Sequence, residues 1–221
     1  MPRASTLKTF LIGGARSGKS SLATRWSLSR ANEVCCIVTA TVSDAEMASR
    51  IAAHRSQRPA HWRVREEPVH LGAAIRTEAA AGTLLLVDCL TLWTANCLWP
   101  PVPLAGPSTG LSAQPCAGPS ASSAGRSAQS STGPSASSAG TASPDLAGWR
   151  LERQDLADAL RDYRGEIILV SNEVGMGIVP ENAAARLFRD EQGSLNQAIA
   201  ALCDEVFLVA AGLPLALKEC G

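Results

Sequence analysis

The stretch that decides the fold lies near the start of the 221-residue chain and reads Thr9-Phe-Leu-Ile-Gly13-Gly-Ala-Arg-Ser-Gly18-Lys19-Ser20. Its second part fits the pattern G-x-x-x-x-G-K-[ST] at every defined position. A short apolar run precedes the pattern and a helical pattern follows it, which is the strand–loop–helix context that this motif requires. Glycines let such a loop curl until successive backbone N–H groups point at phosphate oxygens, and the following helix N-terminus adds positive potential. The stretch therefore predicts a phosphate-binding loop, or P-loop.

The side chains of this loop suit a nucleoside triphosphate. Lys19 neutralises the β and γ oxygens, Ser20 binds Mg²⁺, and Arg16 adds a further donor. A chance glycine-rich turn is the competing interpretation, and the agreement between motif and context argues against it. The expected nucleotide-binding residues of the loop are Gly13, Gly14, Ala15, Arg16, Ser17, Gly18, Lys19 and Ser20.

Further apolar runs follow at 34–39, 84–87, 167–170 and 205–210. They are unbroken rather than alternating, as is typical of strands buried on both faces of a parallel sheet. Helical patterns lie between the runs, at about 19–30, 44–58, 69–81, 91–98, 149–162 and 181–203. Alternating strands and helices predict an α/β fold, with a mostly parallel sheet flanked by helices, as in P-loop NTPases.

An acidic residue ends one of these runs: Asp88 follows Leu84-Leu-Leu-Val87. At the carboxyl end of a strand, a carboxylate can hold the metal of a P-loop site through water. A polar residue that only ends a strand is the alternative. Ser20 and Asp88 are the predicted residues of a Mg²⁺ site.

The tract from Pro100 to Pro144 departs from the pattern. It contains eight of the 13 prolines, a single charge (Arg126) and no aromatic residue. The segment 110–124 is followed directly by a near-duplicate at 125–139. Such a composition cannot offset its ordering entropy, so we expect one domain spanning 1–221 with a disordered insert at about 100–145.

Bulk composition excludes several classes of protein. Lys plus Arg and Asp plus Glu both number 20, so no global basic field indicates nucleic acid or an anionic membrane as a partner. The N-terminus is too short and polar for a signal peptide, and no apolar run approaches the roughly 18 residues of a membrane span. The seven cysteines form no C-x-x-C pair and no zinc spacing. We expect reduced thiols and a cytoplasmic protein.

His54 is a candidate nucleophile on the helix expected at 44–58. Arg50 and Arg58 stand at i−4 and i+4 and share its face. Their positive charge disfavours imidazolium, which keeps the ring neutral, and they could clamp a triphosphate. A histidine attacking an α-phosphate forms an N-linked nucleotidyl intermediate. The competing interpretation is a core stripe of Met47, Ile51 and His54, which the residues alone favour slightly.

Several segments form an ordered set along the chain. They are Gly13–Ser20, the run from Asp44 to His54, Arg58-Pro-Ala-His-Trp-Arg63, Ser171-Asn-Glu-Val-Gly-Met-Gly-Ile-Val-Pro-Glu-Asn182, Ala185-Arg-Leu-Phe-Arg-Asp190, Leu195-Asn-Gln197 and Asp204–Val209. This set resembles the bifunctional cobinamide kinase / cobinamide-phosphate guanylyltransferase family of the cobalamin pathway. The resemblance covers residues 7–99 and 149–218, and the tract 100–145 is longer and more repetitive than the family's connection.

The resemblance implies two reactions. The first phosphorylates the aminopropanol hydroxyl of adenosylcobinamide with ATP or GTP, and the second transfers GMP from GTP to that phosphate with release of pyrophosphate. It also implies that His54 carries the GMP and that the protein forms a small homo-oligomer, with a trimer expected. The nucleotide contacts that it implies outside the loop are Val38, Thr39, Ala40, Arg55, Ser56, Gln57, Arg58, Glu66 and Asp88.

Two other functions fit parts of the sequence. A simple P-loop kinase for a small molecule would use the same loop without a nucleotidyl step. A GTP-dependent switch would need a guanine-specificity motif such as N-K-x-D, and the sequence contains none. The residues alone predict a P-loop phosphotransferase, and the cobinamide substrate rests on the resemblance.

Overall fold

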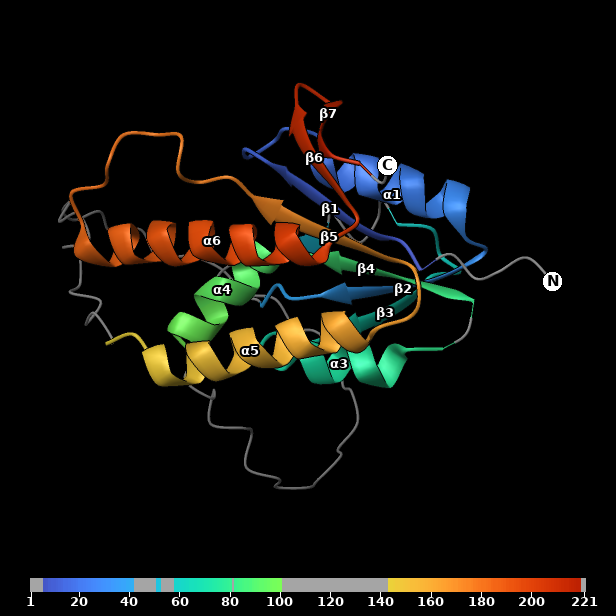
Figure 1. Cartoon of the computed structure of the whole chain (residues 1–221), viewed down its shortest axis with the longest axis horizontal. Coiled ribbons are helices and arrows are strands. Elements are labelled where there is room, and N and C mark those ends of the chain that lie inside the picture. Colours follow the sequence, from blue (N-terminus) through green and yellow to red (C-terminus); the bar gives the residue numbers. More distant parts are fainter. Residues whose placement is uncertain (1–5, 42–50, 53–57, 81, 101–142, 220–221) are drawn as a thin grey trace, which may run out of the picture. The chain divides into compact units, whose positions relative to one another are not determined.

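The computed structural model describes residues 6–41, 51–52, 58–80, 82–100 and 143–219. The strands in this part of the chain are β1 (Lys8–Gly13), β2 (Glu33–Val38), β3 (Arg63–Glu66), β4 (Thr83–Asp88), β5 (Ile167–Asn172), β6 (Glu205–Ala210) and β7 (Leu213–Lys218). They form one sheet in the order β3-β2-β4-β5-β1-β6-β7 (Figure 1). All neighbours pair in parallel except β6 and β7. The predicted α/β fold with a mostly parallel sheet is confirmed.

Helices cover both faces of this sheet (Figure 1). They are α1 (Lys19–Arg30), α3 (Leu71–Glu78), α4 (Leu90–Leu98), α5 (Leu146–Asp162) and α6 (Ala183–Leu202). Helix α1 packs into the core cluster on one face, and α3 to α6 pack into the cluster on the other. None of these described helices has the length and apolar composition to cross a membrane.

The two core clusters explain the unbroken apolar runs. In β5, Ile167 and Leu169 join the cluster beneath α3 to α6, whereas Ile168 and Val170 join the cluster beneath α1. Successive side chains of a strand point to opposite faces, so a strand covered on both faces needs an apolar residue at every position. Polar side chains of the central strands are thereby confined to the strand ends.

The described cysteines are free thiols in this structure. They are Cys35, Cys36, Cys89, Cys97 and Cys203. Burial raises the pKa of Cys36 and of Cys203 to about 12, so both thiols stay protonated at neutral pH.

Two strands depart from the sequence expectations. Strand β3 has only four residues, Arg63-Val-Arg-Glu, of which three are charged, and β7 contains Pro214, which argues against a strand. Both are edge strands with exposed side chains. A half-exposed edge strand needs no continuous apolar run, and so it gives a weaker signal. The helix predicted at 44–58 lies mostly outside the described residues.

The two ends of the Pro/Ser/Gly/Ala-rich tract meet in the core unit. The backbone N–H of Asp145 donates to the carbonyl of Leu98, the last residue of α4, at 2.8 Å. The Asp145 side chain then caps α5 by accepting from the N–H of Gly148. Residues 101–142, which include most of the predicted insert, lie outside the described part of the chain.

Because these ends already touch, the tract should be removable. We expect replacement of Pro101–Pro144 by a short Gly/Ser linker to leave both activities implied by the resemblance nearly intact. Shortening a loop from about 50 to about 5 residues recovers about 2 kcal/mol of closure entropy, so thermal unfolding should move to slightly higher temperature. In the full chain, limited proteolysis should cut first within 100–145. Loss of folded, active protein on this deletion would show that the tract is structural.

Candidate nucleotide-binding site

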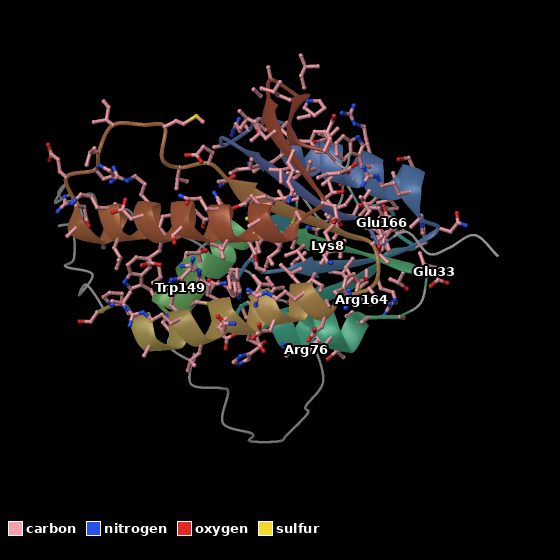
Figure 2. The ribbon with its side chains drawn as sticks, viewed as in Figure 1. Lys8, Glu33, Arg76, Trp149, Arg164 and Glu166 are labelled. Carbon is pink, nitrogen blue, oxygen red and sulfur yellow. The ribbon has the colours of Figure 1, made fainter. Side chains whose placement is uncertain are left out.

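Most of the predicted site residues that the structure describes lie at the carboxyl edge of the sheet. Gly13, Asn172, Asp88 and Val38 end four strands that pair in parallel, and Glu66 ends β3 beside Val38. Parallel strands bring their carboxyl ends to one edge, which is where ligands bind in open α/β sheets. Figure 2 labels Lys8, Glu33 and Glu166, which mark the opposite edge, where β1, β2 and β5 begin.

The loop after β1 adopts the backbone of a phosphate-binding turn. Arg16 and Gly18 have φ values of 57° and 93°, in the left-handed region. The Ser17 N–H donates to the Gly14 carbonyl, and the Leu22 N–H donates to the Gly18 carbonyl as α1 begins. Gly14, Ala15 and Arg16 are exposed at the tip. The turn thus presents the N-terminus of α1 to solvent, where it attracts anions.

The β6–β7 hairpin packs against this loop and explains two of its glycines. The hairpin turn contains Gly212, whose N–H donates to the Ser17 carbonyl at 2.8 Å. A Cβ atom on Gly18 would lie 2.9 Å from the Gly212 Cα, and one on Gly13 would overlap the Val209 carbonyl oxygen. No real Cβ fits so close to backbone. The glycines therefore permit close packing as well as the curled backbone.

Lys19 lies beneath the loop. Its side chain is buried, and Nζ donates to the Gly14 carbonyl at 2.9 Å. Burial lowers the pKa of Lys19, while the nearby Cys89 and Asp88 act in the opposite direction. An ammonium group with so little solvent around it interacts strongly with an incoming phosphate.

Ser20 and Asp88 meet at the start of α1. Ser20 Oγ donates to Asp88 Oδ1 at 3.3 Å, and Arg58 Nη2 lies 3.5 Å from Asp88 Oδ2. A hydroxyl and a carboxylate are hard oxygen ligands, which suit Mg²⁺ when phosphates and water complete its octahedron. Among the described residues, no three His, Cys, Asp or Glu side chains cluster as metal ligands. The oxygens of Ser20 and Asp88 fit a metal whose other ligands come from a nucleotide and water.

Thr39 joins β2 to β4 beside this pair. Its hydroxyl donates to the Cys89 carbonyl at 2.6 Å and accepts from the Cys89 N–H at 3.1 Å. The side-chain amide of Asn96 donates to the Thr39 carbonyl at 2.8 Å. The Thr39 side chain is fully buried, so in this structure it fixes the position of the β4 end, and with it Asp88.

Of the other predicted nucleotide contacts, four lie within the described residues and four lie outside them. Val38 is buried, Ala40 is partly buried, Arg58 is held at Asp88 and Glu66 is exposed at the end of β3. His54, Arg55, Ser56 and Gln57 lie outside the described residues.

Sequence reasoning missed three residues of this edge: Thr91, Asn172 and Asn196. Asn172 gave a usable signal, because it closely follows an apolar run in the same way as Asp88. Thr91 and Asn196 gave none, because each belongs to a helix that meets β5 only in the folded chain.

Lys19→Ala should strongly lower the rate of phosphoryl transfer from a nucleoside triphosphate. The substitution removes the buried ammonium that the motif predicts will face the β and γ oxygens, and loss of one such contact typically costs about 10²–10³ in rate. The measurement is steady-state turnover of a nucleoside triphosphate, with thermal unfolding as the check on folding. Unchanged turnover in a folded variant would mean that the loop only positions some other ligand.

Comparison with known proteins identifies the family. Residues 9–217 match the family described as cobinamide kinase / cobinamide phosphate guanyltransferase. The bifunctional adenosylcobalamin biosynthesis protein CobP of Pseudomonas aeruginosa is 41% identical over 212 residues, which cover 96% of this chain and 98% of that protein. The proteins of the same description named CobU are 35% identical in Salmonella typhimurium and 32% in Escherichia coli, each over 94% of this chain and 98% of the relative.

Among solved structures, an ATPase domain gives a TM-score of 0.45 at 10% identity, over 98% of this chain and 78% of that chain. The family match and the full-length relatives carry the assignment. The chain belongs to the cobinamide kinase / cobinamide phosphate guanyltransferase family.

Proposed function

We propose that this protein phosphorylates adenosylcobinamide with ATP or GTP and then transfers GMP from GTP to the adenosylcobinamide phosphate. The product would be adenosylcobinamide-GDP, an intermediate in the nucleotide-loop assembly of cobalamin biosynthesis. The observation that carries the proposal is the pairing of a complete P-loop with Ser20 and Asp88, 3.3 Å apart at the carboxyl edge, in a member of this family. The trimer that the family resemblance implies stays a prediction.

In the kinase step, the hydroxyl oxygen of the aminopropanol arm attacks the γ-phosphorus of the nucleotide. A new O–P bond forms, the bond from the γ-phosphorus to the β–γ bridging oxygen breaks, and the hydroxyl proton leaves to solvent or to a nearby base. Lys19 and the backbone N–H groups of Gly13–Ser20 hold the phosphates in line and balance their charge. Little covalent chemistry is required of the protein, so positioning and electrostatics supply the rate.

Mg²⁺ is the cofactor that we propose for both steps, held by Ser20 and Asp88. When bound, it neutralises charge on the phosphate oxygens of the nucleotide. Asp88 already faces Arg58 at 3.5 Å, so the guanidinium holds this carboxylate in place beside the loop. Ser20, the first polar side chain after Lys19, is kept within hydrogen-bonding distance of that carboxylate by the start of α1.

In the transfer step, we propose that a ring nitrogen of His54 attacks the α-phosphorus of GTP. A P–N bond forms while the bond to the bridging oxygen of pyrophosphate breaks. An oxygen of the cobinamide phosphate then attacks the same phosphorus, and the P–N electron pair returns to the imidazole. Two steps suit this reaction, because the acceptor phosphate is a poor, negatively charged nucleophile toward a charged α-phosphate. Arg55, Ser56, Gln57 and Arg58 follow His54 in the chain and would contact the nucleotide.

The assignment of Asp88 is tested by Asp88→Asn. The amide keeps the size of the side chain but removes the charge that faces both the proposed metal and Arg58. The Mg²⁺ concentration for half-maximal kinase rate should rise by about tenfold or more. Asp158→Asn is the matched control, because Asp158 is an exposed carboxylate of α5 paired with Arg161. An unchanged Mg²⁺ requirement in Asp88→Asn would remove Asp88 from the metal site.

His54→Ala should separate the two reactions. Kinase chemistry passes the γ-phosphoryl group directly to a hydroxyl and needs no histidine. The variant should therefore keep appreciable kinase activity, yet lose guanylyl transfer and the capture of labelled GMP. Capture is measured by incubation with α-labelled GTP and Mg²⁺, denaturation and counting of protein-bound label. An adduct that is labile in acid and stable in alkali indicates a phosphoramidate.

His61→Ala and His70→Ala are the matched controls and should still capture GMP. Capture by His54→Ala but not by His61→Ala would show that the nucleophile is misassigned. If even the unsubstituted protein captures no GMP, the bifunctional proposal gives way to a simple P-loop kinase.

A further inference from the structure

The end of β5 occupies a distinctive place at the carboxyl edge. Strand β5 lies between β1, which leads into the P-loop, and β4, which ends in Asp88. In register, Asn172 pairs with Gly13, while Asp88 pairs with Val170, two residues earlier on β5. Asn172 is therefore the strand-end residue between the two groups proposed to hold the phosphates and the metal.

The side chain of Asn172 belongs to the same face of the sheet as α1. Side chains alternate along a strand, and Val170 packs in the cluster that includes α1. Ser171 faces the other way, because its hydroxyl donates to Asn196 of α6. Asn172 thus shares the face on which Asp88 meets Ser20. Its side chain is partly exposed, and the described residues give its amide no hydrogen-bond partner.

The backbone of Asn172 is held on both sides by side chains. Its N–H donates to Thr91 Oγ1 of α4 at 2.7 Å, and its carbonyl accepts from Asn196 Nδ2 of α6 at 3.0 Å. These are the last backbone groups of β5, and two helices fix them from outside the sheet. Such an arrangement restricts the direction in which the Asn172 side chain leaves the strand.

Buried polar groups orient Asn196 in turn. Its Oδ1 accepts from Ser171 Oγ at 2.8 Å and from Gln192 Nε2 at 3.0 Å, which leaves Nδ2 to donate to Asn172. Gln192 is fully buried, yet its Oε1 has no hydrogen-bond partner among the residues that the structure describes. A buried carbonyl without a donor costs stability. The Gln192 side chain, which orients Asn196, thus lowers the stability of the fold at its unpaired carbonyl.

We propose that the side-chain amide of Asn172 contacts the γ-phosphate of the nucleoside triphosphate, and that Thr91 and Asn196 are positioning residues for it. This inference rests on the proposed function, since it assumes a triphosphate in the P-loop. The Asn172 amide lies on the α1 face between the loop and Asp88, where the terminal phosphate would lie. A neutral amide donates to a phosphate oxygen without adding a charge beside Lys19 and the metal.

The test compares the affinities of Mg²⁺–GTP and Mg²⁺–GDP, measured by calorimetry. Asn172→Ala should lower the affinity for GTP by about tenfold to hundredfold, as expected for a hydrogen bond to a charged group, and leave the affinity for GDP unchanged. Asn172→Asp, which has the same shape but adds a negative charge, should lower the affinity for GTP further and should also leave the affinity for GDP unchanged. Both measurements omit the corrinoid and do not use His54, so failure of the proposed transfer step would not alter them.

The positioning role is tested at Thr91. Thr91→Val keeps the shape of the side chain but removes the acceptor for the Asn172 N–H, so it should lower the GTP affinity relative to that for GDP. Thr91→Ser should restore the ratio. Thr94→Val is the matched control, because Thr94 is a buried threonine of the same helix whose hydroxyl donates only within α4. It should leave the ratio unchanged.

Thermal unfolding establishes that each variant is folded, and Asn172→Asp serves if Asn172→Ala does not fold. An unchanged GTP-to-GDP ratio in a folded Asn172 variant would overturn the proposed contact. An equal loss of affinity for both nucleotides would also overturn it, because the contact would not be specific to the γ-phosphate. An equal effect of Thr91→Val and Thr94→Val on the ratio would overturn the positioning role.

Discussion

Parallel pairing of β1 with β5 on one side and β6 on the other is the constraint from which the candidate site follows. Parallel strands are connected through helices that cover both faces of the sheet, so the middle positions of the central strands accept only apolar side chains and polar groups remain at the ends. The pairing also sets the spacing of those ends. Neighbouring strands lie about 4.8 Å apart, so the ends of β1 and β4, with β5 between them, are separated by roughly 10 Å. Helix α1 bridges that interval when Ser20 reaches Asp88.

Much of this arrangement could be predicted from sequence, because the signals are local. The pattern from Gly13 to Ser20 predicts both the conformation of its own backbone and the phosphate that this backbone binds. Four-residue apolar runs ended by a polar residue, such as the run before Asp88, show where parallel strands stop. The direction and burial of these strands follow from the same runs, since a strand covered on both faces needs apolar residues throughout.

The remainder depends on contacts between distant parts of the chain. Nothing near Thr91 or Asn196 in sequence indicates that both will bond to the backbone of Asn172. In the same way, the requirement for glycine at Gly18 arises partly from the approach of Gly212, almost 200 residues later. Thr39 was expected to contact nucleotide, and the structure shows its side chain bonded to Cys89. Such pairings appear only when the strand order is known.

The hydrogen bond between Asp145 and Leu98 allows the length of the chain between α4 and α5 to vary during evolution. It completes the junction of α4 and α5 without using any residue of the repetitive tract. We expect gain or loss of one 15-residue repeat here to leave the pairing register of the described strands unchanged, because the repeat lies between α4 and α5. The junction of α4 and α5 is also suited to insertion of a whole domain, because the two ends of the inserted domain would join the chain at adjacent points. This junction is far in sequence from the loop at Gly13.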